Sequence, residues 1–216
     1  MIAARAQRRV GVLISGRGSN LQALIDAIAD GRLDASIAVV ISNKPAAEGL
    51  RRAAAAGIEA LVLDQRAFAS RAEYDTEMAS LLRSRGVAVV CLAGFMRLVG
   101  APLLEAFPDA ILNVHPSLLP AFPGLDAQAQ AIAHGVRVSG ATVHLVTGEL
   151  DGGPIVLQGA VPVFDLDTSE TLSARILEVE HRIYPEAVQL VLDGGWRIDG
   201  RRFLRPVTPP ASPAGA

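Results

Sequence analysis

The stretch Arg9–Ala29, RVGVLISGRGSNLQALIDAIA, passes from an apolar segment through a glycine-rich turn into a helical pattern. We expect Arg9–Ser15 to be a strand covered on both faces, because its apolar run does not alternate with polar residues. Ser19–Ala29 is predicted to be a helix, because its apolar residues recur at the spacing of one helix face. These residues are Leu21, Leu24, Ile25 and Ile28. A strand, a tight turn and a helix in this order are typical of a βαβ unit.

The same alternation continues through the first half of the chain. Further strands are expected at Ser36–Ser42, Ala60–Leu63, Val87–Leu92 and Ala110–Val114. The helices between them are expected at Ala46–Ala56 and Ser70–Arg85, and the second opens with Ser70 and Glu73 at the spacing of a capping box. Together these elements predict an α/β fold with an open, mostly parallel sheet and helices on both faces.

The second half has a mixed character. After a helix at Gln128–His134, strands are expected at Ala141–Val146 and Pro154–Val163, and a long helix at Ser169–Leu192, which Pro185 should interrupt or kink. Gly195–Phe203 is expected to add a hairpin. We predict a single domain over residues 1–203, parallel over 9–110 and mixed over 111–203, followed by a disordered tail at 204–216.

Composition and charge exclude several classes of protein. The 216 residues suit one domain, and the net charge of −2 gives no electrostatic footprint for nucleic acid or an anionic membrane. No apolar run reaches the length of a membrane span, and the first residues do not resemble a signal peptide. The single cysteine, Cys91, excludes an intramolecular disulfide and suits a reducing compartment. We therefore expect a cytoplasmic protein without nucleic-acid or membrane partners.

The turn at Gly16–Gln22, GRGSNLQ, has the composition of an anion site. Gly16 and Gly18 allow a close backbone approach, and Ser19 or Asn20 can cap a helix whose free N–H groups attract a phosphate. The alternative is an ordinary tight turn with a good cap. Leu21 stands where a dinucleotide fingerprint would have its third glycine, so a small phosphorylated metabolite fits better than a dinucleotide.

A second polar group lies where the strand in Ile111–Gly124, ILNVHPSLLPAFPG, runs into a proline-rich loop. Asn113 and His115 are two positions apart, so on a strand their side chains share one face. An amide donor beside an imidazole suits a reaction that builds negative charge on a carbonyl oxygen. The alternative is that His115 only hydrogen-bonds the loop.

Asp151, in ELDGGP, can support a histidine or simply form a turn, and the sequence alone does not pair it with His115. His134 is expected at a helix end, His144 on a strand and His181 on the long helix, each in an ordinary structural role. No metal-ligand motif is present in the sequence, so no metal is expected.

Five blocks of the sequence resemble one family over most of the chain. They are GVLISGRGSNLQALI, VVCLAGFMRLV, ILNVHPSLLPAFPG, SGATVHLVTGELDGGPIVLQ and EVEHRIYPEAV, and they resemble the glycinamide ribonucleotide formyltransferases of de novo purine synthesis. The resemblance implies a Rossmann-like formyltransferase fold. It also implies direct formyl transfer from the co-substrate 10-formyltetrahydrofolate to the amine of glycinamide ribonucleotide, without metal or covalent intermediate.

The resemblance implies roles for particular residues. Asn113 and a protonated His115 would stabilise the tetrahedral oxyanion, Asp151 would support the imidazolium and help to move the amine proton, and Thr142 would support the His–Asp arrangement. The ribonucleotide would bind in part at 9–110 and folate with the catalytic residues at 111–203. Implied ribonucleotide-binding residues are Gly18, Ser19, Asn20, Leu177, Glu178, Val179 and Glu180. Implied folate-binding residues are Arg71, Met96, Arg97, Leu98, Val99, Asn113, Thr147, Gly148, Glu149, Leu150 and Asp151.

One segment departs from the family, and related activities stay open. Asp126 and Ala129 replace side chains that in many members could touch phosphate or folate.

Methionyl-tRNA formyltransferase is expected to carry a further C-terminal domain, and formyltetrahydrofolate hydrolase an N-terminal regulatory domain, neither of which this sequence resembles. A non-catalytic folate-binding module is a third alternative, and the protein is expected to be a monomer or homodimer.

Overall fold

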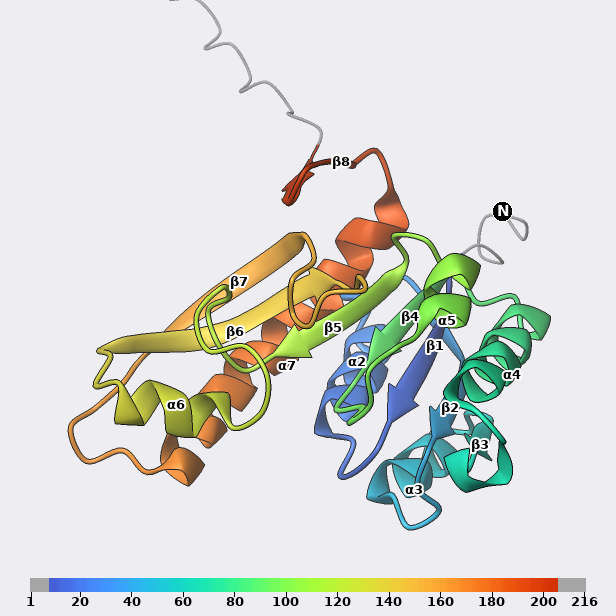
Figure 1. Ribbon diagram of the computed structural model, residues 1–216, viewed down its shortest axis with the longest axis horizontal. Helices are drawn as coiled ribbons and strands as arrows, with labels where there is room; N and C mark the ends of the chain where they lie inside the picture. The colour runs from blue at the N-terminus through green and yellow to red at the C-terminus, as the bar shows by residue number, and fades with distance from the viewer. Residues whose placement is uncertain (1–7, 206–216) are drawn as a thin grey trace, which may run out of the picture.

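The computed structural model describes residues 8–205, which form a nine-stranded sheet with helices on both faces (Figure 1). The strand order is β3-β2-β1-β4-β5-β6-β7-β9-β8. The strands are β1 (Arg9–Ile14), β2 (Ser36–Ser42), β3 (Ala60–Val62), β4 (Val89–Leu92), β5 (Ile111–His115), β6 (Val138–Leu145), β7 (Ile155–Pro162), β8 (Arg197–Asp199) and β9 (Arg202–Leu204).

The sheet changes from parallel to antiparallel in its middle. Strands β3, β2, β1, β4 and β5 pair in parallel, whereas β6 pairs antiparallel with both β5 and β7. The hairpin β8–β9 joins through a parallel pair between β9 and β7. The predicted fold class, a mostly parallel α/β sheet that is mixed in its C-terminal half, is therefore confirmed.

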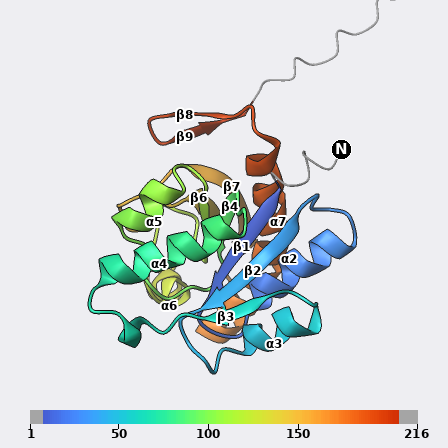
Figure 2. The ribbon, with the colours of Figure 1, turned by 90° about the vertical axis from the view of Figure 1, so that its right-hand side faces the viewer.

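The helices form two layers around the sheet, which Figure 2 shows from the side. They are α2 (Ser19–Ala29), α3 (Glu48–Ala55), α4 (Arg71–Ser84), α5 (Ala101–Ala106), α6 (Ala127–Ala133) and α7 (Ser169–Asp193), with a short 3-10 helix η1 at Gln65–Ala67. Helices α2 and α7 pack on one face, where Leu24 and Ile176 join Val12 in one core. Helices α4 and α5 pack on the other face, where Met78 and Leu103 join Leu13 in a second core. Because β1 contributes to both cores, it is covered on both faces, as its continuous apolar run predicts.

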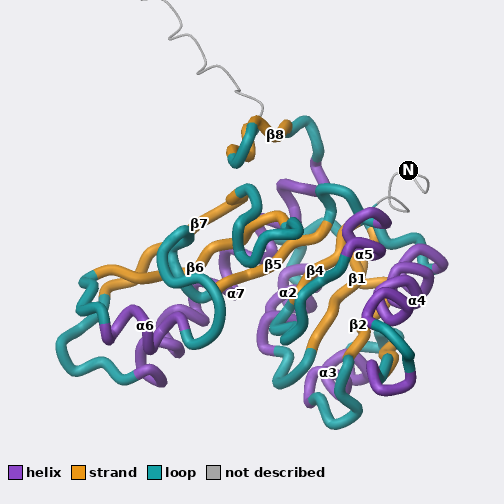
Figure 3. Tube along the Cα trace, viewed as in Figure 1, coloured by secondary structure: helices purple, strands orange, loops and turns teal. Residues whose placement is uncertain are grey.

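Three differences from the sequence-based expectation concern helices. Helix α5 and η1 were not predicted, because each is shorter than the two or three turns that reveal a helical period (Figure 3). The predicted interruption at Pro185 is wrong, since α7 runs unbroken through this residue. Proline removes a single helical hydrogen bond, and the buried neighbours Tyr184 and Ala187 keep both flanks packed on the sheet.

The chain ends add one difference. Leu204, predicted to begin the tail, belongs to β9, and the remainder of the predicted tail from residue 206 onward lies outside the described residues. None of the helices within residues 8–205 combines the length and apolar character needed to cross a membrane.

The topology brings the segments that follow β1, β4 and β5 to one edge of the sheet. The chain leaves β1 toward β2 on one side and returns to β4 on the other, so the carboxyl ends of β1 and β4 flank a topological switch point, where ligands bind in open α/β sheets. The turns after these two strands are joined by hydrogen bonds from Ser15 N to Gly94 O (3.1 Å) and from Met96 N to Ser15 Oγ (2.9 Å). β5 lies next to β4, so Asn113 and His115 reach the same edge.

Candidate active site

The pairing of residues between β5 and β6 brings the central side chains of the site together. Asn113 pairs with His144, and His115 pairs with Thr142, across the antiparallel ladder. All four side chains therefore point to the same face of the sheet. Asn113 Nδ2 lies 3.2 Å from His144 Nε2. His144 was assigned an ordinary strand role from the sequence and is in fact a member of this cluster.

Asp151 completes the cluster from the loop between β6 and β7. Its Oδ2 lies 3.4 Å from His115 Nδ1, and its Oδ1 lies 3.6 Å from His144 Nε2. The side chains of His115, His144 and Asp151 are 6%, 3% and 8% exposed, so the cluster is buried. The Gly124 N–H donates to Asp151 Oδ2 over 2.8 Å, which ties the proline-rich loop to the carboxylate.

The electrostatics keep Asp151 charged. Burial raises the pKa of its carboxyl, but the contact with His144, the Gly124 N–H and the charge of the neighbouring imidazoles outweigh burial and hold the pKa below its ordinary value. A carboxylate that remains ionised can hold a positively charged imidazole beside it.

Hydrogen-bond partners determine where the imidazole protons lie. His115 Nε2 is 2.8 Å from the Phe122 carbonyl oxygen, which only accepts, so Nε2 carries a proton. His115 Nδ1 faces the Asp151 carboxylate, with Nδ1 and Oδ2 3.4 Å apart. His144 Nδ1 is 3.0 Å from the Leu145 carbonyl oxygen and donates to it for the same reason, and His144 Nε2 lies between Asn113 Nδ2 (3.2 Å) and Asp151 Oδ1 (3.6 Å). His115 thus hydrogen-bonds the loop, as one reading of the sequence held, and contacts Asp151 as well.

Thr142 supports the loop that follows His115. Its Oγ1 donates to Ser117 O (2.6 Å) and accepts from Leu119 N (3.0 Å) and Gln158 Nε2 (3.0 Å). These hydrogen bonds fix the start of the proline-rich loop rather than contacting His115 or Asp151 directly.

The glycine-rich turn after β1 takes a form that the sequence did not predict. Gly18 is the N-cap of α2, with φ of 72°, and no side chain caps this helix. The prediction that Ser19 or Asn20 caps it is wrong, because both residues are already inside the helix. A Cβ on Gly18 would lie 2.7 Å from Gly49 Cα, so this position requires glycine for its conformation and for space. The first N–H groups of α2 have no side-chain partner and are suited to an anion.

Asn20 is instead engaged with α7. Its Nδ2 donates to Glu180 Oε2 over 2.7 Å, and both residues are buried. Burial raises the pKa of Glu180 to about 7, against the opposing effect of the hydrogen bond from Asn20. Asn20 Oδ1 has no hydrogen-bond partner within residues 8–205, so one acceptor of this pair is left for a ligand.

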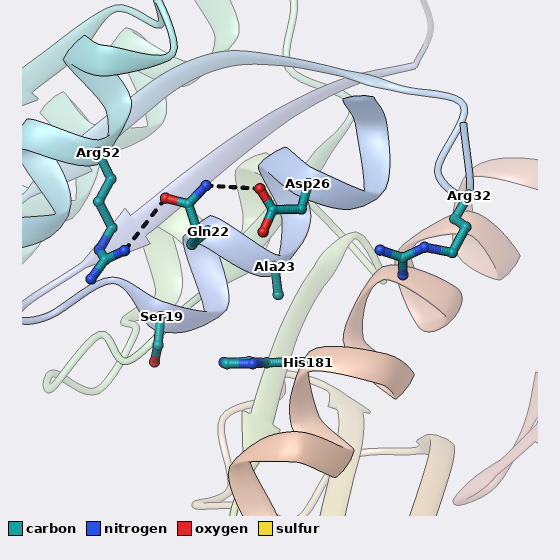
Figure 4. A pocket seen from close by; sticks show the side chains of 7 residues that line it. All are labelled: Ser19, Gln22, Ala23, Asp26, Arg32, Arg52 and His181. Carbon is teal, nitrogen blue, oxygen red and sulfur yellow. Dashed lines mark hydrogen bonds between the residues drawn. The ribbon is translucent and has the colours of Figure 1, made fainter. Parts of the chain in front are cut away.

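A cavity of about 240 Å³ lies beside this turn, between α2 and α7 (Figure 4). It is lined by Ser19, Gln22, Ala23, Asp26, Arg32, Arg52 and His181. Arg52 Nε donates to Arg17 O over 2.9 Å, which braces the turn and brings a cation close to it. Burial lowers the pKa of His181, although the charge of Asp26 opposes this. The cavity places a cation and an imidazole next to the uncapped helix end.

The remaining predicted residues lie around the same edge or on α7. Leu177 and Val179 are half-buried on α7, and Glu178 is exposed. Met96 and Leu98 after β4 and Leu150 beside Asp151 are more than half exposed, although they are large and apolar. Exposed apolar side chains around a polar cluster are typical of a ligand-binding surface. Asp126 is the N-cap of α6, with φ of 55°, and is exposed, as is Ala129.

Comparisons with known proteins agree on one family. The model of the formyl transferase family matches residues 8–188. The phosphoribosylglycinamide formyltransferase of Escherichia coli (strain K12) is 45% identical over 200 residues, which are 89% of this chain and 94% of that protein. The crystal structure of glycinamide ribonucleotide transformylase 1 from Symbiobacterium toebii superimposes with a TM-score of 0.90 at 56% identity, covering 91% of this chain and 93% of that one.

Longer proteins match over the same region. The trifunctional purine biosynthetic protein adenosine-3 of Gallus gallus is 47% identical over 190 residues, which are 88% of this chain and 19% of that protein. The chain therefore spans about a fifth of the length of this relative.

Proposed function

The chain belongs to the formyl transferase family, and we propose that it is a phosphoribosylglycinamide formyltransferase that uses 10-formyltetrahydrofolate as co-substrate. The observation that carries this proposal is the half-buried Asn113 beside the buried side chains of His115 and Asp151, at the same sheet edge as the uncapped N-terminus of α2. The three side chains suit acyl transfer to an amine, and the N-terminus of α2 suits the phosphate of the ribonucleotide that carries this amine.

In the proposed reaction the substrate amine attacks the formyl carbon, and the formyl oxygen becomes an oxyanion. The half-buried Asn113 amide and the Nε2–H of His115 supply N–H donors for it. For His115 to donate to substrate, its Nε2–H must exchange the Phe122 carbonyl for the oxyanion. Asp151 holds the imidazolium throughout and assists the transfer of a proton from the attacking amine to the leaving folate nitrogen.

His144 adds a positioning role that the sequence did not suggest. Because its Nε2 accepts from one amide hydrogen of Asn113, the orientation of the amide is fixed, and the second hydrogen stays available for the oxyanion. A preoriented donor is worth more in catalysis than one that must reorganise.

We propose that the two halves of the domain divide substrate binding. The 9–110 half would hold the ribonucleotide phosphate at Gly18, Ser19 and Asn20, and α7 would contribute Leu177–Glu180 to the sugar end. Folate would lie against Met96–Val99 and Thr147–Asp151, with Arg71 toward its acidic tail. We further propose a cytoplasmic protein that acts as a monomer or homodimer without a nucleic-acid partner, consistent with its net charge of −2.

The test is turnover of 10-formyltetrahydrofolate by the purified protein with and without glycinamide ribonucleotide, followed by the absorbance of the folate product. Product should form only when the ribonucleotide is present. Equal rates in its absence would identify a hydrolase and refute the proposal.

Asn113→Ala provides the residue-level check. Losing one oxyanion donor costs about 3 kcal/mol, so kcat should fall by a factor of about one hundred or more. Ribonucleotide binding, measured by calorimetry, should be retained, because Asn113 lies on β5 and is not among the residues proposed to hold the phosphate, which follow β1. A variant with unchanged kcat would exclude the role proposed for Asn113.

A further inference from the structure

Helix α3 braces the glycine-rich turn after β1 through two backbone carbonyls. The Gly49 N–H donates to Gly16 O over 3.1 Å, and Arg52 Nε donates to Arg17 O over 2.9 Å. Both peptide groups are trans, so the N–H of each points away from its own carbonyl oxygen. These are the N–H groups of Arg17 and Gly18, and the brace therefore directs both of them away from α3.

The N–H groups on that side of the turn have no acceptor of their own. Within residues 8–205, neither the Arg17 N–H nor the Gly18 N–H donates a hydrogen bond. The N–H groups of Ser19 and Asn20 follow directly, in the first turn of α2, where a helix offers no partner. Successive N–H groups of this kind form a concavity that binds an anion.

The peptide group between Arg17 and Gly18 needs the brace because glycine leaves it free to rotate. Gly18 has φ of 72°, but a glycine adopts a negative φ about as readily. If this peptide group turned over, it would present the Arg17 carbonyl oxygen to an anion in place of the Gly18 N–H. The charge-assisted hydrogen bond from Arg52 stabilises the orientation in which the N–H faces the anion.

The guanidinium of Arg52 is engaged by the protein at all three nitrogen atoms. In addition to the hydrogen bond from Nε, Nη2 lies 3.1 Å from Glu48 Oε1, and Nη1 lies 3.4 Å from Gln22 Oε1. Gln22 lies near the start of α2, so Arg52 joins α3 both to the turn and to this helix (Figure 4). Because Glu48 offsets its charge, Arg52 is better suited to hold the turn than to bind an anion itself.

We infer that Arg52 is a positioning residue for the phosphorylated substrate, because it holds the Gly18 N–H toward the phosphate. The inference rests on the proposed function, which assigns the ribonucleotide phosphate to Gly18, Ser19 and Asn20. Without the brace, only a fraction of the molecules would hold the turn in the binding orientation, and the apparent affinity falls by that fraction. A bound phosphate holds the N–H in place by itself, so the chemical step does not depend on Arg52.

The test replaces Arg52 by methionine and by glutamine. Methionine matches the length of arginine as far as Nε but has no donor, whereas glutamine carries an uncharged N–H donor at the position of Nε. In Arg52→Met, KM for the ribonucleotide should rise about tenfold, while kcat and KM for 10-formyltetrahydrofolate stay within about twofold. In Arg52→Gln, KM for the ribonucleotide should stay within about threefold of its original value, because the hydrogen bond to Arg17 O can still form.

Arg51→Met is the matched control. Arg51 is the neighbouring arginine on α3, but it is exposed and does not line the cavity beside the turn. The variant removes one positive charge from the same helix and should leave KM for both substrates in place.

Three results would overturn the inference: an unchanged KM for the ribonucleotide in Arg52→Met, an equal rise in Arg52→Met and Arg52→Gln, or a rise of the same size in Arg51→Met. If the unmodified protein does not turn over the ribonucleotide, the proposed function fails instead. Calorimetric titration with ribose 5-phosphate then tests the turn directly, and Arg52→Met should bind it about tenfold more weakly than the unmodified protein. Equal affinities, or no binding to the unmodified protein, would refute the positioning role.

Discussion

Replacing Glu180 by glutamine should change how the stability of the protein depends on pH. Glu180 is buried on α7, and its pKa is raised from 4.5 to about 7. In the unfolded chain the same carboxyl titrates near 4.5. Between these two pH values the folded protein holds a proton that the unfolded chain has lost, so stability falls as pH rises through this window. Below pH 4.5 both states are protonated, and above pH 7 the full penalty of a buried carboxylate is present.

The size of this effect follows from the difference between the two pKa values. Each pH unit is worth about 1.4 kcal/mol, so a difference of about 2.5 units corresponds to about 3 kcal/mol of unfolding free energy. Glutamine is neutral throughout and can still accept the hydrogen bond from Asn20. As pH rises from 4.5 to 8, the unfolding free energy of the Glu180→Gln variant should therefore increase by about 3 kcal/mol relative to that of the unmodified protein.

The assay is denaturant unfolding of both proteins at several pH values across this window. Glu186→Gln makes the same chemical change at an exposed position on the same helix, and it should leave the pH dependence of the unmodified protein in place. If the curves for Glu180→Gln and the unmodified protein run parallel from pH 4.5 to pH 8, the buried carboxyl of Glu180 does not titrate as argued.

Two further substitutions test the site. Gly18→Ala should destabilise the protein by about 1–3 kcal/mol, because alanine disfavours the left-handed conformation and its Cβ would meet Gly49 Cα. Gly16→Ala should cost much less in the same unfolding experiment, since a Cβ there meets nothing within 4 Å, and equal losses would contradict this reasoning. His144→Gln should lower kcat about tenfold or more while KM for the ribonucleotide changes little, because the Asn113 amide loses its orienting acceptor. An unchanged kcat in steady-state kinetics would remove His144 from the proposed mechanism.

The strands and long helices could be predicted because their signals are local. The apolar run of β1 and the helical period of α2 each fit within about ten residues, and both elements were placed within one residue of their observed bounds. Helix α5 escaped prediction because six residues hold too little of a period, and because its apolar residues follow directly on the loop after β4.

The site was harder to predict because its contacts join distant parts of the chain. The position of His144 opposite Asn113 depends on the antiparallel register of β5 and β6, which no property of the ATVHLV segment specifies. One signal was available: Thr142 and His144 alternate with the apolar residues of this strand, so they had to share one face. The helix cap at Ser19 or Asn20 was mispredicted for a similar reason, since Asn20 has a stronger partner 160 residues away in Glu180.

The hydrogen bond between Asn20 and Glu180 joins the two halves of the chain at the proposed ribonucleotide site. Helix α7 belongs to the C-terminal half, but it packs against α2 and against β4 and β5. The Tyr184 hydroxyl lies 3.1 Å from the carbonyl oxygens of both Leu92 and Leu112, which share its one proton. This anchoring fixes α7 along its axis, so Glu180, one turn before Tyr184, is held against Asn20 beside the phosphate turn. The 9–110 half carries the phosphate turn but lacks the carboxyl that α7 brings to it. In the proposed function, a site for the whole ribonucleotide would therefore form only when α7 is docked, which would couple substrate binding to the packing of the two halves.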